Sequence, residues 1–187
     1  MKKIDIKHFS QHSESVPEEW RTKTCGVTCV KMILDFKDSN SSPKISDLIE
    51  EGLLIGAYQD GRGWFHEGLV TLLRNHNIPA YRQEYKSANF NLETKEIIPS
   101  PDSPMQREGI RKIHDELNKN RPVIVSVEKD FSDTSETHLV LLNGFAEDEV
   151  GLEGFFYLDP HVTDSKEKFV ELDKFKKLWR NLAIFTE

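Results

Sequence analysis

Cys25 is a candidate for chemistry because it lies where a helix is expected to begin. Thr24 can act as the N-cap of that helix, since its side-chain oxygen can accept a backbone N–H that the first turn leaves unpaired. Val27, Val30 and Leu34 then recur at intervals of three and four, which predicts a helix that buries one face. The positive end of a helix dipole favours thiolate over thiol. We therefore interpret Cys25 as a candidate nucleophile.

A reactive thiolate needs a base, and His138 is the histidine best placed to be one. It begins residues 138–145, an apolar segment that predicts a buried strand directly after a polar loop. Its side chain is therefore expected at the end of a sheet, where a cleft can form. For the other histidines we expect only local hydrogen bonds, and for Cys29, inside the apolar stripe, a buried hydrophobic role.

Asp159 ends the next predicted strand, residues 155–159. If this strand and residues 138–145 form an antiparallel hairpin, the start of the first lies beside the end of the second. His138 is then expected opposite Asp159. A carboxylate can orient an imidazole that acts as general base and acid toward a thiol. The three residues together therefore predict nucleophilic catalysis more strongly than any one of them.

The elements that position these residues follow from the pattern of apolar residues. We expect residues 1–23 to form an extended arm and residues 86–105, which include Pro99, Pro101 and Pro104, to form a long loop that either borders a cleft or is mobile. The expected order is helices first and then consecutive strands, which indicates an α+β fold with the helix of Cys25 packed on an antiparallel sheet. Predicted helices begin at 25, 45, 64, 106 and 172, and predicted strands cover 80–85, 122–127, 138–145, 155–160 and 182–185.

The 187 residues are enough for one well-filled core, so we expect a single domain over residues 1–187. The formal net charge of −7 and the lack of a Lys/Arg cluster disfavour nucleic acid or an anionic membrane surface as partners. A cationic or neutral partner, such as a basic peptide, is easier to accommodate. No signal peptide and no apolar segment of about 20 residues is present. With two unpaired cysteines, we expect a cytoplasmic protein.

Four stretches of the sequence, in the same order, resemble the papain-like bacteriocin-processing peptidases, also called double-glycine leader peptidases, and their free-standing relatives. They are residues 25–34, 121–127, 138–145 and 157–160. The resemblance implies a papain-like fold in which Cys25 is the nucleophile, His138 is the general base and acid, and Asp159 orients His138. It also implies a peptide or protein substrate and no cofactor.

The sequence departs from this family at position 19. The family usually carries a glutamine six residues before the nucleophile, whose amide helps to bind the oxyanion, whereas this chain has Glu19. A carboxylate cannot donate that hydrogen bond unless it is protonated, and removing one oxyanion donor typically costs about 100- to 1000-fold in turnover. Gln11 can take its place only if the N-terminal arm folds back.

The sequence is therefore consistent with two functions. The first is a cysteine peptidase that forms a thioester acyl-enzyme. The second is a papain-like domain of weak or no activity that binds a peptide or protein partner, which Glu19 would permit. A metal site through His8 and His12, or through Cys25 and Cys29, is disfavoured because four ligands with a recognisable spacing are absent.

Overall fold

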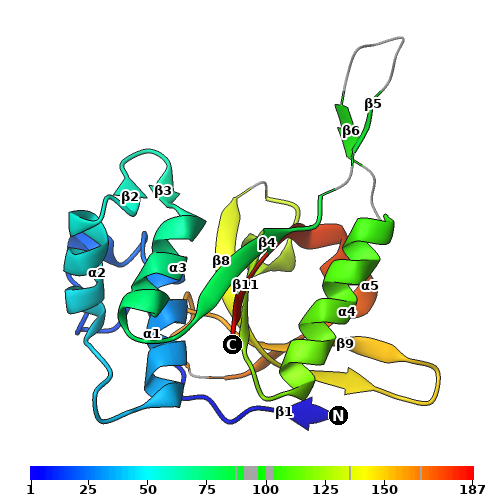
Figure 1. Ribbon diagram of the computed structural model, residues 1–187, viewed down its shortest axis with the longest axis horizontal. Helices are drawn as coiled ribbons and strands as arrows, with labels where there is room; N and C mark the ends of the chain where they lie inside the picture. The colour runs from blue at the N-terminus through cyan, green and yellow to red at the C-terminus, as the bar shows by residue number, and fades with distance from the viewer. Residues whose placement is uncertain (87, 91–96, 100–102, 135, 165) are drawn as a thin grey trace.

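The structure is a computed structural model that describes residues 1–86, 88–90, 97–99, 103–134, 136–164 and 166–187. A group of helices lies on one side of the molecule and a sheet with two further helices lies on the other (Figure 1). The helices are α1 (Cys25–Lys37), α2 (Ile45–Leu54), α3 (His66–Asn75), α4 (Pro104–Asn118) and α5 (Leu172–Leu178), with 3₁₀ turns η1 (Glu18–Trp20) and η2 (Lys129–Phe131). The strands are β1 (Lys2–Lys3), β2 (Tyr58–Gln59), β3 (Gly63–Trp64), β4 (Ala80–Glu84), β5 (Ala88–Phe90), β6 (Ile97–Pro99), β7 (Val123–Glu128), β8 (Thr137–Glu147), β9 (Leu152–Leu158), β10 (Lys168–Glu171) and β11 (Trp179–Thr186).

The main sheet is antiparallel, in the order β10, β9, β8, β7, β11 and β4, and β1 pairs with β8 beside this path. The central strands β7 and β8 are buried over almost their whole length. Their continuous apolar, β-branched sequences suit strands that are covered on both faces. The core of the protein therefore runs along these two strands, and the first residues of β8 lie at one end of it.

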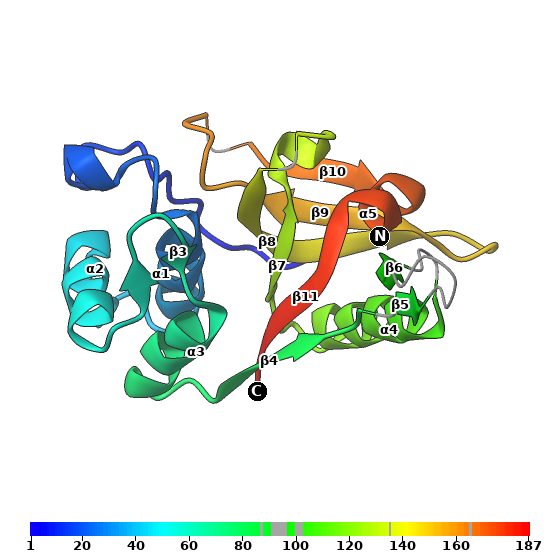
Figure 2. The same cartoon turned by 90° about the horizontal axis from the view of Figure 1, so that it is seen from above.

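The helices meet the sheet in two places. α1 packs against β8 and also contacts α2 and α3, while α4 contacts β7, β8 and β11. Figure 2 shows α1, α2 and α3 as a separate group beside the sheet, with α4 running along the sheet on the other side. The apolar stripe of α1 is fully buried between these elements. The N-terminal end of α1 is thereby held against the start of β8.

This architecture confirms the predicted α+β fold, with the helix of Cys25 packed on an antiparallel sheet. The strand predicted for residues 80–85 is also observed, as β4, and it lies at the edge of the sheet. The last helix and closing strand, α5 and β11, follow as predicted, but β11 inserts between β7 and the edge strand β4. Hydrophobic periodicity predicts where a strand runs, but strand order depends on contacts between distant segments.

Several local predictions need correction. Thr24 precedes α1, but its side chain does not cap the helix, and its Oγ1 atom is buried without a hydrogen-bond partner among the described residues. Trp64 belongs to β3, so the third helix begins two residues later than predicted. Part of the loop predicted for residues 86–105 lies outside the described residues. Within it, β5 and β6 pair antiparallel and α4 begins at Pro104, so the segment contains regular structure.

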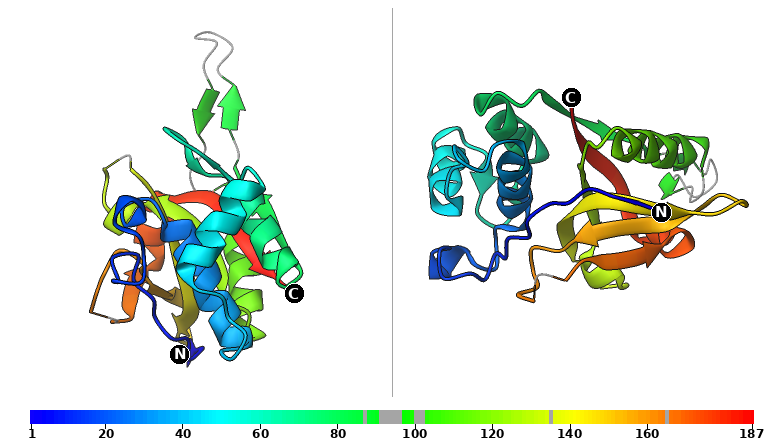
Figure 3. Two further views of the ribbon diagram at one scale, coloured as in Figure 1. Left: turned by 90° about the vertical axis from the view of Figure 1, so that its left-hand side faces the viewer. Right: turned by 90° about the horizontal axis from the view of Figure 1, so that it is seen from below.

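The N-terminal arm, residues 1–23, begins on the sheet and runs across to the helical group, so it is not an isolated extension (Figure 3). Its backbone is anchored by β1 on β8 and by the Ile4 N–H, which donates to the Asn143 carbonyl at 2.7 Å. Farther along, the Gln11 N–H donates to the Pro160 carbonyl at 2.8 Å. The arm therefore passes beside the segment that follows β9.

Among the described residues, no helix combines the length and apolar character that crossing a bilayer requires.

Leu69 tests the packing that holds the start of α1. This residue of α3 is fully buried, and its Cδ1 atom would lie 2.7 Å from a Cβ placed on Gly26. Leu69→Ala is expected to lower the free energy of unfolding by about 2–5 kcal/mol, because it removes buried methyl groups and leaves a cavity. Urea denaturation measures the change.

Leu54→Ala is the matched control, because Leu54 also lies on a helix but is 89% exposed. It is expected to change the free energy of unfolding by less than about 0.5 kcal/mol. Equal effects of the two substitutions would contradict this description of the core.

Candidate active site

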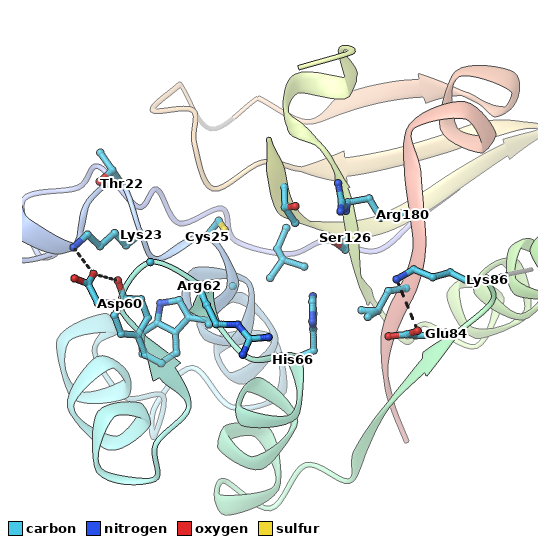
Figure 4. Close-up of a pocket in the computed structure, with 18 residues that line it drawn as sticks. Thr22, Lys23, Cys25, Asp60, Arg62, His66, Glu84, Lys86, Ser126 and Arg180 are labelled. Carbon is cyan, nitrogen blue, oxygen red and sulfur yellow. Dashed lines mark hydrogen bonds and ion pairs between the residues drawn. The ribbon is translucent and has the colours of Figure 1, made fainter. Parts of the chain in front are cut away.

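Cys25 is the first residue of α1 and lines a cleft of about 570 Å³ between the helical group and the sheet. Figure 4 shows it at the end of the helix that faces this cleft. Its side chain is partly exposed, whereas the rest of the apolar stripe of α1 is buried. The thiol is therefore accessible from the cleft while its helix is fixed in the core.

His138 and Asp159 form a buried hydrogen-bonded pair. The Nε2 atom of His138 lies 2.8 Å from Oδ1 of Asp159, and the two residues are 5% and 1% exposed. The same Oδ1 accepts the backbone N–H of His161 at 2.9 Å, and Oδ2 accepts Lys168 Nζ at 3.0 Å. Both carboxylate oxygens of Asp159 are thus used, which fixes the imidazole plane of His138.

Cys25 hydrogen-bonds to the same imidazole. Because Nε2 of His138 faces Asp159, the thiol meets the remaining nitrogen, Nδ1. Burial acts to raise the pKa of Cys25. The hydrogen bond and charge of His138, together with backbone N–H groups of Leu139 and Gly26, outweigh burial and lower that pKa. The three predicted site residues therefore form one connected chain.

The pKa of His138 changes in the opposite direction. Burial acts to lower it, but hydrogen bonds and opposite charges from Asp159 and Cys25 raise it to about 9. The pKa of Asp159 is lowered, since hydrogen bonding and charge from His138, with help from the His161 N–H and Lys168, overcome the effect of burial. At neutral pH the arrangement favours a thiolate, an imidazolium and a carboxylate.

The strand register differs from the one expected. Leu141 of β8 is the residue opposite Leu158, the last residue of β9, so His138 lies beyond the end of β9 and not directly opposite Asp159. Bulges between Leu142 and Gly144 and between Ala146 and Glu147 shift the pairing by one residue in opposite directions, so the register at Leu141 is the same as at the turn, where Glu147 lies opposite Leu152. The side chains of His138 and Asp159 still meet because Asp159 follows the last residue of β9.

Glu19 lies away from this chain of residues. It is exposed on η1 and does not line the cleft. Gln11 is buried, and the arm does fold back, but its Nε2 donates to the Arg21 carbonyl at 2.8 Å while its Oε1 has no partner among the described residues. Among the described residues, neither Glu19 nor Gln11 forms a side-chain hydrogen bond with Cys25.

The wall of the cleft opposite the sheet contains residues that sequence reasoning did not identify. His66, for which only local hydrogen bonds are expected, lines the cleft, and its Nε2 is buried without a hydrogen-bond partner among the described residues. Burial and the charge of Arg82 lower the pKa of His66. Trp64 packs with Tyr58 and Trp20 at ring-centroid distances of 5.3 and 6.0 Å, which anchors this wall to η1. Only tertiary contacts bring these segments together.

The remaining cysteine and histidines have other partners. Cys29 is fully buried, as expected, and its pKa is raised well above the usual value by burial and by the nearby Cys25 and Asp159. His8 Nε2 lies 2.8 Å from the Asp159 carbonyl, and His12 Nε2 lies 3.0 Å from Nδ1 of His161. In the part of the chain that the structure describes, no three His, Cys, Asp or Glu residues are arranged to hold a metal ion.

Comparison with known proteins gives the same fold. A sequence model of the Peptidase_C39 like family matches residues 3–184. A putative C39-like peptidase from Bacillus anthracis is 16% identical, with a TM-score of 0.66 and coverage of 100% of this chain and 98% of that chain. The peptidase domain of Streptococcus ComA, a bi-functional ABC transporter involved in a quorum sensing pathway, is 17% identical, with a TM-score of 0.59 and coverage of 96% of both chains.

A third similar structure is a double glycine motif protease from an AMS/PCAT transporter in complex with the leader peptide. It is 12% identical, with a TM-score of 0.54 and coverage of 98% of this chain and 93% of that chain. No curated protein matches the chain. At these identities the structural similarities show a shared papain-like peptidase fold.

Lys168 tests how the buried Asp159 carboxylate is held. Lys168→Met removes the cation on Oδ2, and because Lys168 is itself 32% exposed, we expect a loss of about 1 kcal/mol in the free energy of unfolding near pH 7. The pKa of Asp159 is depressed by folding, so this contribution is present above its unfolded pKa of about 3.9 and fades as the pH falls. Urea denaturation at several pH values measures it.

Lys166→Met is the control, because Lys166 is 80% exposed and lies 3.8 Å from the exposed Asp164. It is expected to have no measurable effect at any pH. A loss for Lys168→Met that persists unchanged in acid would show that the cation does not act through Asp159.

Proposed function

The chain belongs to the Peptidase_C39-like family, and from this premise we propose that it is a cysteine peptidase in which Cys25, His138 and Asp159 form the catalytic triad. The observation that carries the proposal is the interaction of the Cys25 thiol with His138, which lowers the pKa of Cys25, together with the 2.8 Å hydrogen bond between His138 and Asp159. Family and fold support a cysteine peptidase in general, and this geometry supports the assignment of roles.

In the proposed reaction, the Cys25 thiolate attacks the carbonyl carbon of a peptide bond and forms a tetrahedral oxyanion. The imidazolium of His138 then donates its proton to the leaving amine as the C–N bond breaks and a thioester remains on Cys25. His138, now neutral, removes a proton from water, which attacks the thioester and releases the acid. When the acid is released, Cys25 is again a thiolate and His138, with the proton taken from water, is again an imidazolium. Asp159 keeps the imidazole oriented throughout.

The oxyanion needs hydrogen-bond donors close to Cys25. The first intrahelical hydrogen bond of α1 is donated by Thr28 to Thr24, so the N–H groups of Cys25, Gly26 and Val27 have no partner within the helix. We propose that backbone N–H groups of this first turn supply the donation that Glu19 cannot. This arrangement places the developing charge at the positive end of the helix dipole.

A second function, binding a peptide without cutting it, is favoured by the side chains near the arm. Glu19 is exposed and carries no amide, and the amide of Gln11 already donates to the Arg21 carbonyl, so neither side chain offers a free amide to the oxyanion. A papain-like fold with a weakened oxyanion site can still hold a peptide in its cleft. Turnover by the wild-type protein separates the two functions.

The substrate is proposed to be a peptide or a protein segment. One structure of the same fold contains a leader peptide, and the cleft beside Cys25 is open to a chain from outside. The two cysteines are unpaired, which suits the reducing cytoplasm that we propose as the place of action.

Cys25→Ala is expected to abolish peptide hydrolysis, because no other group in the triad can form the acyl-enzyme. The free energy of unfolding should change by less than about 0.5 kcal/mol, since Cys25 is only partly buried. Cleavage of a quenched fluorescent peptide library measures activity, and urea denaturation measures stability. Hydrolysis that survives Cys25→Ala would eliminate this mechanism.

The pH dependence of kcat/KM follows from the two shifted pKa values. On the acid side, activity falls as the Cys25 thiolate is protonated. Because the pKa of Cys25 is lowered, the midpoint of this acidic limb lies below pH 8.5, the approximate pKa of a free thiol. On the alkaline side, activity falls as the His138 imidazolium loses its proton at a pKa of about 9. A rate that rises steadily up to pH values above this limit would contradict an ion-pair mechanism.

A further inference from the structure

The cleft beside Cys25 carries a charge opposite in sign to that of the whole chain. The protein has a formal net charge of −7. Within the cleft, however, cationic side chains outnumber carboxylates: the cations are Lys23, Arg62, Lys86 and Arg180, and the carboxylates are Asp60 and Glu84. A local excess of one charge in a cleft concentrates ligands of the opposite charge. The cleft therefore attracts anionic groups even though the protein as a whole repels them.

The cations differ in how firmly they are already paired. Arg62 makes no ion pair within the described part of the chain, and its guanidinium lies 5.5 Å from the centre of the Phe65 ring. Lys86 reaches Glu84 only at 3.9 Å, and both of those side chains are largely exposed. Arg180 is held more closely, at 2.9 Å from Glu128. Lys23 lies 3.7 Å from Asp60. Arg62 and Lys86 are thus the least closely paired of the four cations and the most available to a bound anion.

Two ring nitrogens in the same cleft also need a partner. Trp64 is 9% exposed, and its Nε1 is buried without a hydrogen-bond acceptor among the described residues. An indole N–H is a donor only, so an oxygen acceptor must come from a ligand or water. His66 Nε2 is likewise buried without a partner among these residues. A ring nitrogen of a neutral histidine can donate or accept, so it is the indole N–H of Trp64 that calls for an oxygen acceptor, independently of the charge.

We propose that the cleft selects acidic peptides, with Arg62 and Lys86 as specificity-determining residues for Asp or Glu side chains of the substrate. Figure 4 shows Arg62 and Lys86 on either side of His66, with Cys25 nearby. This inference rests on the proposed peptidase function and names the class of its substrate.

Binding to the Cys25→Ala protein tests this selectivity without turnover. The probes are fluorescein-labelled peptides that share one Gly/Ser/Ala sequence and carry Glu, Gln or Lys at the same positions. Fluorescence anisotropy is expected to show the Glu peptide binding about ten-fold more tightly than the Lys peptide at low salt. The double substitution Arg62→Gln and Lys86→Gln should reduce this preference to less than about three-fold.

The matched control removes two cations elsewhere, Lys37→Gln and Lys174→Gln, both of them exposed and outside the cleft. It should keep the preference for Glu. Equal binding of the three peptides, binding of none of them, a preference for Lys, or an equal loss of preference in the control protein would overturn the proposal.

A second readout uses the thiol itself and needs no peptide. The ratio of alkylation rates with anionic iodoacetate and neutral iodoacetamide at Cys25 is expected to fall about five-fold in the Arg62→Gln, Lys86→Gln protein and to stay constant in the control protein. An unchanged ratio in both would overturn the proposal. A Glu preference in a protein that hydrolyses no peptide would leave the acidic selectivity in place and would contradict the peptidase function alone.

Discussion

The contact between the start of α1 and the start of β8 is the constraint on which the site depends. It joins the thiol of Cys25, on the helical group, to His138 on the sheet, and Asp159 then ties His138 to the end of β9. Neither half contains the complete set of residues. Any shift of α1 against the sheet would separate thiol from imidazole, so the packing of the two halves determines the chemistry of the cleft between them.

Gly26 shows how closely these elements approach. A Cβ at this position would lie 2.7 Å from Leu69 Cδ1 on α3 and 2.9 Å from Leu139 Cδ1 on β8. Only a glycine lets the first turn of α1 fit between these side chains without rearrangement. The same closeness lets the Leu139 N–H, next to His138, reach the thiol of Cys25. The close approach of the first turn of α1 to β8 therefore accounts both for the tight packing at Gly26 and for the electrostatic stabilisation of the thiolate.

The fold class and the residues that meet at the site are predictable from sequence because they depend on local patterns. The start of an apolar helical stripe identifies Cys25, although the cap predicted at Thr24 is not formed, and strand ends identify His138 and Asp159. The bulged register of β8 and β9, the place of β11 in the sheet and the role of His66 are not predictable in this way, since they arise from contacts between distant segments. The net charge of the chain does not predict the charge of the cleft either, because it does not say where the charged residues lie.

The most direct test of the central claim is the pH dependence of iodoacetamide alkylation at Cys25, with Cys29 in the same digest as the internal reference. We predict that Cys25 reacts with an apparent pKa below that of a free thiol, about 8.5, and that His138→Ala abolishes this shift while buried Cys29 stays unreactive. A normal or raised pKa for Cys25, or a lowered one that is unaffected by His138→Ala, would contradict the account.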